Sequence, residues 1–212
     1  MSAPAETTAE LAYPKPAPTE RSIHPLLVER YSPHAFTDEP VPEAVLERLL
    51  AAARWAPSSF NEQPWRFVVA HRERDPDAHA AIVDVLAEGN QAWASQAPVL
   101  VLTVTKQTFS FNGEPNAHAR HDVGLAAAQL TVQATAEGIG VHQMAGFDAE
   151  AARQRFGIPE SFEPVTAIAL GYPAGPDELG DELAERAAGP RERRPLDEIV
   201  HRSADEPVPF GE

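Results

Sequence analysis

The sequence predicts one layered domain of the α/β or α+β class. Segments with apolar residues at helical spacing alternate with short apolar runs typical of strands. The chain has 212 residues, of which 43% are hydrophobic, so it is long enough to bury a sizeable core. No internal repeat is visible, which excludes a solenoid or a propeller.

The two ends of the chain are expected to be irregular. Residues 1–22 are rich in Pro, Ala, Thr and Glu without a hydrophobic period, and they predict a disordered N-terminal arm. The folded domain is expected over residues 23–200, and residues 201–212 are expected to form a flexible C-terminus. The acidic tail from Gly175 onward is rich in Pro and Gly, which is typical of an extended arm that wraps another surface.

Within the domain, apolar residues three and four positions apart predict helices. They are expected at residues 42–55, 77–88, 118–137 and 148–156. Asp148 suits the N-cap of the last helix, and Gly157 suits its C-terminal end. The helix over 118–137 is rich in Ala and carries Gly124, so we expect it in the core or at a subunit interface.

Short, nearly continuous apolar runs predict four strands. They are expected at residues 65–70, 98–104, 139–144 and 165–170. The second of these runs reads P-V-L-V-L-T-V, as expected for a strand that is covered on both faces. The strands are separated by the helical segments or by loops rich in Gly, Asn and Pro.

Composition narrows the possible functions. The chain has 17 basic and 32 acidic side chains, giving a net charge of −15, which argues against non-specific nucleic-acid binding. Lys15 and Lys106 are the only lysines, so nearly all positive charge is arginine, which favours clamping of anions over Schiff-base chemistry. The absence of cysteine excludes disulfides, thiolate catalysis and cysteine-ligated metals.

Membrane association and secretion are not expected. The longest apolar stretches run about 8 residues, far short of the roughly 20 that a membrane span needs. No basic and apolar leader opens the sequence. A chain without such a leader and without disulfides is most simply read as cytoplasmic.

Two arginine-bearing segments are candidates for binding an anion. Arg30, Ser32 and His34 are spaced two residues apart, with Tyr31 between the first two, so their side chains can address one phosphate. The alternative is a solvated turn around a buried Phe36. In the tail, Arg191 and Arg193 belong to a cluster that can clamp phosphate, or that is simply a solvated run of charge.

Two further segments are candidates for contacting a flat ring. The segment A-P-S-S-F-N-E-Q-P-W (56–65) offers two amides two residues apart, which suit the edge of a heteroaromatic ring, or which serve only as caps and turns. Its candidate residues are Pro57, Ser58, Ser59, Asn61 and Gln63. At the end of a strand, Gly146 after Ala145 would let a flat ligand lie against bare backbone, or is a turn glycine.

Other chemistries have weaker signals. His118, His121 and Asp122 have the spacing of a helical metal site, but no HExxH motif or third ligand set accompanies them, so no metal is expected. Gly138-Ile139-Gly140 lacks the third glycine of a dinucleotide fingerprint. No GxSxG motif is present, so neither serine of the 56–65 segment is expected to be a nucleophile. We expect no catalytic side chain.

Taken together and in order, these segments resemble the nitroreductase-like family of FMN-dependent oxidoreductases. The pattern comprises R-x-S-x-H-x-F (30–36), A-P-S-S-F-N-E-Q-P-W (56–65), a small-residue helix, A-G-F before an Asp-led helix (145–148), G-I-P (157–159), L-G-Y-P (170–173) and the Arg-rich P-L-D-E-I-V segment (191–200). The resemblance covers roughly residues 23–200. The 56–65 segment is its most specific part.

The resemblance implies an α+β fold with a central mixed, largely antiparallel sheet flanked by helices. It also implies an intertwined homodimer with FMN at the subunit interface. By residue, Arg30, Ser32, Arg191 and Arg193 match the phosphate end of the site. Tyr31 lies within the same motif and is a further cofactor-binding candidate, and His34 matches a position beside the flavin ring, near N1 and O2. Asn61 and Gln63 match positions near the ribityl chain and ring, and Pro57, Ser58 and Ser59 match a turn toward the flavin of the other subunit. Ala145 and Gly146 match the backbone beside the ring, and Asn90 is matched across a loop of altered length.

Two departures from the family pattern affect the chemistry. His34 stands where the family usually has Arg or Lys, and a neutral imidazole would stabilise negative charge on a reduced flavin less well than a cation. Ala145 stands where several members have a carboxylate, so only backbone contacts carry over there.

The implied activity is electron transfer from NADH or NADPH through FMN to a small planar acceptor, such as a nitroaromatic or a quinone, in a two-step exchange. Two alternatives remain open. One is a flavin enzyme of the same fold with different chemistry, namely dehydrogenation, dehalogenation or flavin cleavage. The other is a non-catalytic flavin-binding protein.

Overall fold

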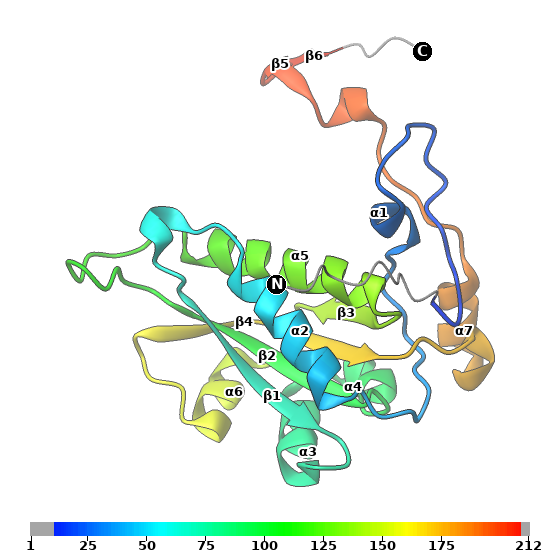
Figure 1. Cartoon of the computed structure of the whole chain (residues 1–212), viewed down its shortest axis with the longest axis horizontal. Helices are drawn as coiled ribbons and strands as arrows, with labels where there is room; N and C mark the ends of the chain where they lie inside the picture. The colour runs from blue at the N-terminus through cyan, green and yellow to red at the C-terminus, as the bar shows by residue number, and fades with distance from the viewer. Residues whose placement is uncertain (1–10, 209–212) are drawn as a thin grey trace, which may run out of the picture.

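The computed structural model describes residues 11–208 and is built on a four-stranded sheet (Figure 1). The strands are β1 (Trp65–His71), β2 (Val99–Lys106), β3 (Gly140–Met144) and β4 (Phe162–Gly171). Their order in the sheet is β1-β2-β4-β3, and each neighbouring pair is antiparallel. The expected α+β class with a largely antiparallel sheet is therefore confirmed.

The sheet has a different helical layer on each face. Val99 and Val101 of β2 pack with α2 (Glu43–Arg54) and α5 (Ala119–Ala136) in a core centred on residues such as Leu49 and Leu130. The alternate residues of β2, Leu100 and Leu102, face the opposite side. There they pack with α3 (Pro76–Val85), α4 (Glu88–Ala94) and α6 (Ala149–Phe156). The period of two along β2 thus divides the core into two halves.

The central strands β2 and β4 are interrupted by one bulge. Val101 pairs with Ile168, but the register shifts between Thr103 and Val104, so that Val104 faces Pro164. Proline has no backbone N–H to donate to a ladder, and bulges are the positions where a sheet tolerates it. Pro164 therefore accounts for the bulge.

The predicted caps of the helix after β3 are confirmed. The Asp148 carboxylate accepts hydrogen bonds from the backbone N–H groups of Glu150 and Ala151, at 3.0 and 2.9 Å. Gly157 follows the last residue of α6 with φ of 60°, in the left-handed region that glycine adopts without a steric cost. These local rules fix both ends of the helix.

The predicted C-terminal end of the helix over residues 77–88 is wrong. The helix α3 ends at Val85, because Leu86 turns to an extended conformation (φ −71°, ψ 151°) and forms a bridge with Phe147. Leu86 is buried by this contact. The chain then starts a second helix, α4, which the sequence analysis did not predict.

The described parts of the two chain ends run beside each other (Figure 1). The helix α1 (Pro25–Glu29) precedes the R-x-S motif, and the backbone N–H of Ala17 donates to the Val28 carbonyl at 2.8 Å. The tail contains α7 (Asp181–Ala188), which was not predicted, and a hairpin of β5 (His201–Ser203) and β6 (Glu206–Pro207). The tail also contains two short 3-10 turns, η2 (Pro176–Glu178) and η3 (Leu196–Glu198).

The domain boundaries stay predictions. Residues 1–10 of the expected N-terminal arm and residues 209–212 of the expected flexible C-terminus lie outside the described residues. Within the described part, residues 11–22 of the arm lie against the tail, and Leu11 is buried. No helix of the described residues combines the length and the apolarity that a membrane crossing requires.

Candidate functional site

A cavity of about 270 Å³ opens between residues 13–35 and residues 174–193. It lies between the R-x-S segment, α7 and the Arg-rich tail. Five cationic side chains and one carboxylate, that of Glu192, line it; the cations are Lys15, Arg30, Arg186, Arg191 and Arg193. In a chain with a net charge of −15, this excess of positive charge marks a place where an anion is favoured.

The arginines of the cavity face one another without neutralising partners. Burial lowers the pKa of Arg30, and the nearby charge of Arg193 lowers it further. The pKa of Arg191 is also lowered, first by burial and then by the charges of Arg30 and Arg193. No ion pair found within residues 11–208 includes any of the three. Like charges held together in this way are stabilised when an anion binds between them.

Hydrogen bonds orient these arginines. Arg30 Nη1 donates to the Ser32 hydroxyl at 3.3 Å. Arg191 Nη1 donates to the backbone carbonyls of Lys15 and Val28, at 2.6 and 2.8 Å, and Arg193 Nη1 donates to the carbonyl of Glu192. The two predicted arginine-bearing segments, more than 150 positions apart in the sequence, are therefore brought into one cavity.

His34 lines the same cavity as a neutral imidazole. Burial lowers its pKa to about 4, with further contributions from the charges of His142, Arg186 and Lys15. Its ring meets the Trp93 ring edge-on at 5.0 Å between centroids, and the His142 ring at 4.5 Å. His142 is fixed in turn by a 2.8 Å hydrogen bond from Nδ1 to the Pro33 carbonyl. His34 therefore adds no charge to the cavity at neutral pH.

Tyr31 and Phe36 have structural contacts. The Tyr31 ring is buried, and its hydroxyl donates to the Tyr13 carbonyl at 2.7 Å, while burial raises the pKa of the phenol. Phe36 is 4% exposed, so the alternative interpretation of the 30–36 segment, a turn around a buried Phe36, describes this one residue. It does not account for the convergence of the arginines.

Asn90, Ala145 and Gly146 come together beside the His34 cluster. Asn90 Nδ2 donates to the Gly146 carbonyl at 2.9 Å, and the backbone N–H of Ala87 donates to the same oxygen. A Cβ at position 146 would lie 2.8 Å from Asn90 Nδ2, so any other residue there would displace the Asn90 amide from this hydrogen bond. Trp93, one helical turn after Asn90, contacts His34 and links this group to the cavity.

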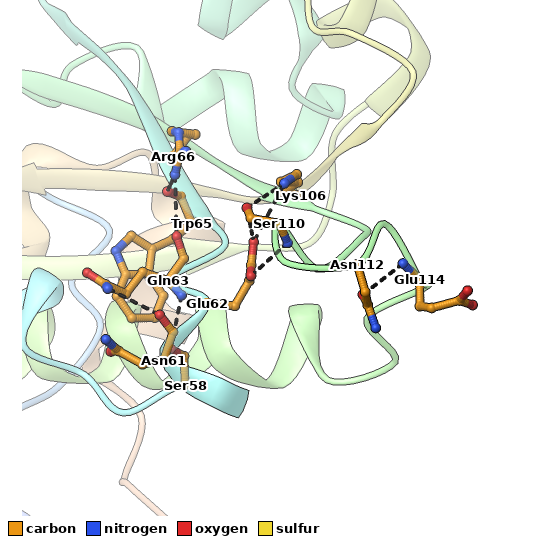
Figure 2. A network of polar contacts seen from close by, with 10 residues as sticks. All are labelled: Ser58, Asn61, Glu62, Gln63, Trp65, Arg66, Lys106, Ser110, Asn112 and Glu114. Atoms are coloured by element: carbon orange, nitrogen blue, oxygen red, sulfur yellow. Dashed lines mark hydrogen bonds and ion pairs between the residues drawn. The ribbon is translucent and has the colours of Figure 1, made fainter.

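The segment over residues 57–63 forms a tight loop around the 3-10 turn η1 (Ser59–Asn61) (Figure 2). Its Ser58 hydroxyl accepts from the Gln63 N–H at 3.0 Å, and Gln63 Nε2 donates to the Asn61 carbonyl at 3.2 Å. Phe60, Asn61 and Gln63 have φ of 52°, 55° and 50°. Left-handed backbone at a non-glycine residue costs on the order of 1 kcal/mol or more, and such strain gathers at functional segments.

A carboxylate that the sequence analysis did not select ties this loop to its neighbour (Figure 2). Glu62 accepts hydrogen bonds from the backbone N–H and the hydroxyl of Ser110, at 2.9 and 2.5 Å, and lies 3.6 Å from Lys106 Nζ. The Ser110 hydroxyl and N–H hold the pKa of Glu62 below its usual range, with a smaller contribution from Lys106. The Glu62 side chain is only 5% exposed, so this network is a fixed part of the loop.

Aromatic side chains cover the outside of the same loop. Phe60 lies 5.6 Å from both Phe109 and Phe111, measured between ring centroids. Phe60 is 80% exposed and Phe111 is 63% exposed, and Trp55, at the C-terminal end of α2, is 78% exposed. Adjacent exposed aromatic rings such as Phe60 and Phe111 are typical of a contact surface.

The 57–63 loop lies at one end of α5, and the segments that line the cationic cavity, around α1 and α7, lie toward its other end (Figure 1). The Ser59 N–H donates to the Asp122 carboxylate in the first turn of α5, at 3.1 Å. Pro33, which lines the cavity, packs against Gly140 just beyond the other end of this helix. The 18 residues of α5 span about 27 Å. The predicted site residues therefore form two separate groups within one chain.

Tyr13, Lys15 and Arg186 also line the cavity, although no sequence pattern had indicated them. The rarity of lysine was the one signal that could have drawn attention to Lys15. The candidate helical metal site is not assembled, since no group of three His, Cys, Asp or Glu side chains within residues 11–208 is placed to hold a metal ion. Asp122 instead receives the hydrogen bond from Ser59.

Comparisons with known proteins agree with the fold. Residues 27–172 match the nitroreductase family. A solved structure described as an oxidoreductase containing FMN is 35% identical, with a TM-score of 0.84, over 91% of this chain and 97% of that chain. A nitroreductase family protein from Clostridium difficile 630 is 25% identical, with a TM-score of 0.65, over 84% of this chain and 96% of that one.

Relatives known from their sequences are also covered over most of their own length. A protein of Thermus thermophilus named NADH dehydrogenase is 28% identical over 204 residues, which cover 82% of this chain and 92% of that protein. A 15.4 kDa protein of Mycolicibacterium smegmatis is 34% identical over 144 residues, which cover 64% of this chain and 93% of that protein.

The fold and these likenesses define the class of protein, which is an oxidoreductase built on an antiparallel α+β sheet. Within that class, the chain belongs to the nitroreductase family.

Proposed function

We propose that this chain is an FMN-dependent oxidoreductase that passes electrons from NADH or NADPH to a small planar acceptor, such as a nitroaromatic or a quinone. The observation that carries the proposal is the cluster of unpaired arginines. Arg30, Arg191 and Arg193 share a cavity with Ser32, and no carboxylate of the described residues forms an ion pair with them.

The chemistry of the cavity fits FMN. A phosphate monoester carries a charge of about −1.5 to −2 at neutral pH, and guanidinium groups are its preferred partners. Arg30, Ser32, Arg191 and Arg193 would hold the phosphate, while the backbone at Ala145 and Gly146, fixed by Asn90, would lie beside the ring. When bound, FMN supplies the redox chemistry, so the site needs no catalytic acid or base from the chain. The neutral His34 would contribute polarity and packing.

The 57–63 loop would complete the site from a second copy of the chain. Within one chain this loop lies at the far end of α5 from the cavity (Figure 1). The exposed Phe60 and Phe111, together with the exposed Trp55 at the end of α2 and Gly124 on α5, are residues that a second copy would cover. Pro57, Ser58, Ser59, Asn61 and Gln63 would then face the FMN held mainly by the other subunit.

An absorbance spectrum tests the proposal. The purified protein, with FMN added if needed, is expected to be yellow and to bleach under nitrogen when NADH or NADPH is added. Steady turnover with a nitroaromatic or quinone is expected to follow. A colourless protein that stays free of added FMN would refute the flavin assignment.

Two other results would separate the alternatives. Bound FMN that no nicotinamide reduces would favour a flavin enzyme with different chemistry, namely dehydrogenation, dehalogenation or flavin cleavage. Reduction without turnover of any acceptor would favour a flavin-binding protein without catalysis. The cytoplasmic location expected from the sequence stays a prediction.

A further inference from the structure

We propose that Lys15, in the N-terminal arm, is a phosphate-binding residue of the FMN site, and that the arm closes one wall of that site. Lys15 lies outside residues 27–172, the part of the chain that matches the family. It nevertheless lines the cavity that contains Arg30, Arg191 and Arg193. The inference rests on the proposed function and adds a residue to it.

The arm is docked on the cavity by contacts along its described length. The Tyr31 hydroxyl donates to the Tyr13 carbonyl at 2.7 Å, and the Ala17 N–H donates to the Val28 carbonyl at 2.8 Å. The Tyr13 ring also lies over Gly175, where a Cβ would be 3.7 Å from two of its carbons. The arm is thereby held at several points between Leu11 and Ala17.

The cavity arginines themselves hold the arm in place. Arg191 Nη1 donates to the Lys15 carbonyl at 2.6 Å. The backbone of Lys15 is therefore held by an arginine that is itself predicted to bind the phosphate. The Lys15 ammonium donates to the Ala187 carbonyl at the end of α7. The arm, α7 and the Arg-rich tail therefore form one connected wall.

Lys15 has donors left for an anion. An ammonium group has three N–H donors, and Ala187 takes one of them. Within residues 11–208 no carboxylate forms an ion pair with Lys15, whereas the other lysine of the chain, Lys106, lies 3.6 Å from Glu62. The charge of Lys15 reaches into the cavity, since it helps to lower the pKa of His34. A half-buried, unpaired ammonium beside three arginines is suited to a phosphate dianion.

This position predicts a specific preference. A residue that contacts the phosphate strengthens binding of FMN but not of riboflavin, which has the same ring and ribityl chain without the phosphate. Lys15 should therefore contribute to discrimination between the two flavins. A merely structural arm residue would affect both flavins equally.

The test measures dissociation constants of FMN and riboflavin, from quenching of flavin fluorescence, in the full-length protein. In Lys15→Gln we expect the constant for FMN to rise by about ten- to a hundredfold, as expected for one charged hydrogen-bonding contact, with the constant for riboflavin changed less than about twofold. Lys15→Glu should weaken FMN binding further, and Lys15→Arg should restore most of it. Arg74→Gln, which removes an exposed arginine paired with Glu43, is the matched control.

The outcomes separate this inference from the proposed function. If wild-type protein does not bind FMN, the proposed function fails. If it binds FMN and Lys15→Gln changes neither flavin, or changes both by the same factor, the assignment of Lys15 is overturned. A second variant, Tyr31→Phe, removes the hydroxyl that holds the Tyr13 carbonyl and leaves every charge in place. It should speed proteolytic cleavage within residues 11–22, and FMN should protect this segment more than riboflavin does. Equal protection by the two flavins would also count against the inference.

Discussion

At the scale of single residues, His34 shows how burial determines the character of a site. Its imidazole lies among Trp93, His142 and the cations of the cavity, and burial lowers its pKa to about 4. The sequence analysis expected a neutral side chain where the family usually has a cation. The structure provides the physical cause, since the charged imidazole would have to form in a half-buried setting and would be a third positive charge beside Arg186 and Lys15.

The lowered pKa of His34 predicts a pH dependence of stability. Between pH 6.5 and about 4 the unfolded imidazole binds a proton that the folded one does not, so the free energy of unfolding is expected to fall as pH falls through this window. His71, His79 and His142, whose pKa values are also lowered, act in the same direction. In His34→Gln the stability difference between pH 7 and pH 5, measured by urea unfolding, should be smaller than in wild type.

The matched control is His121→Gln, which removes an exposed imidazole from α5. An equal pH dependence in His34→Gln and wild type would contradict the assignment of a buried, neutral His34.

Residue types predicted part of the cavity, and the fold supplied the rest. Arg30, Ser32 and Arg191 were selected because arginine and hydroxyl donors at close spacing suit phosphate. Lys15 and Tyr13 were missed because they lie in an irregular arm with no hydrophobic period. Their place at the cavity depends on contacts with residues more than 15 positions away, which no local pattern records.

At the scale of elements, local rules worked where neighbouring residues decide the structure. The strands at β1 and β2 and the helix α5 were predicted close to their observed ends, because apolar period and caps are local signals. The break between α3 and α4 was missed, because it is caused by the bridge between Leu86 and Phe147, residues 61 positions apart. The helix α7 was also missed. None of its residues is buried, so its sequence lacks the apolar face by which a core helix is recognised.

The network around Glu62 predicts that two loops are held as one unit. Glu62→Gln should weaken the bonds to Ser110 and Lys106, at a cost of about 1–3 kcal/mol in the free energy of unfolding. Cleavage of the 107–117 loop by a protease should become faster. Glu114→Gln, in the same loop with an exposed side chain, is the control. Unchanged cleavage and stability in Glu62→Gln would show that the network does not hold the loop.

At the scale of the whole molecule, the main feature is the separation of the two candidate groups along α5 (Figure 1). One group is cationic and lies between residues 13–35 and 174–193, and the other is a strained loop with exposed aromatic side chains. The resemblance to the nitroreductase-like family implied that both belong to one site. Because α5 separates them within one chain, we expect a second copy of the chain to bring them together.

Mixed dimers test this arrangement. Arg30→Ala alters the cavity, and Asn61→Ala with Gln63→Ala alters the loop, so each variant alone should bind FMN weakly. If every site combines the cavity of one copy with the loop of the other, a dimer of one variant with the other has one intact site. Such dimers, purified with two different tags, should bind about one FMN per two chains.

The same experiment can reject the arrangement. Mixed dimers that bind no FMN at concentrations saturating for wild type would show that the two groups do not share a site across copies. Full FMN binding by a monomeric wild-type protein would do the same.

The left-handed backbone at Phe60, Asn61 and Gln63 has a consequence for engineering this enzyme. Glycine adopts such angles freely, so Gly at position 60 or 63 would relieve about 1 kcal/mol of strain, less the entropy that glycine loses on folding. A laboratory selection for heat resistance would therefore tend to enrich glycine at these two positions. If Gln63 contacts the cofactor, such variants would unfold at higher temperatures but turn over more slowly. Thermal stability and turnover rate would then have to be selected together.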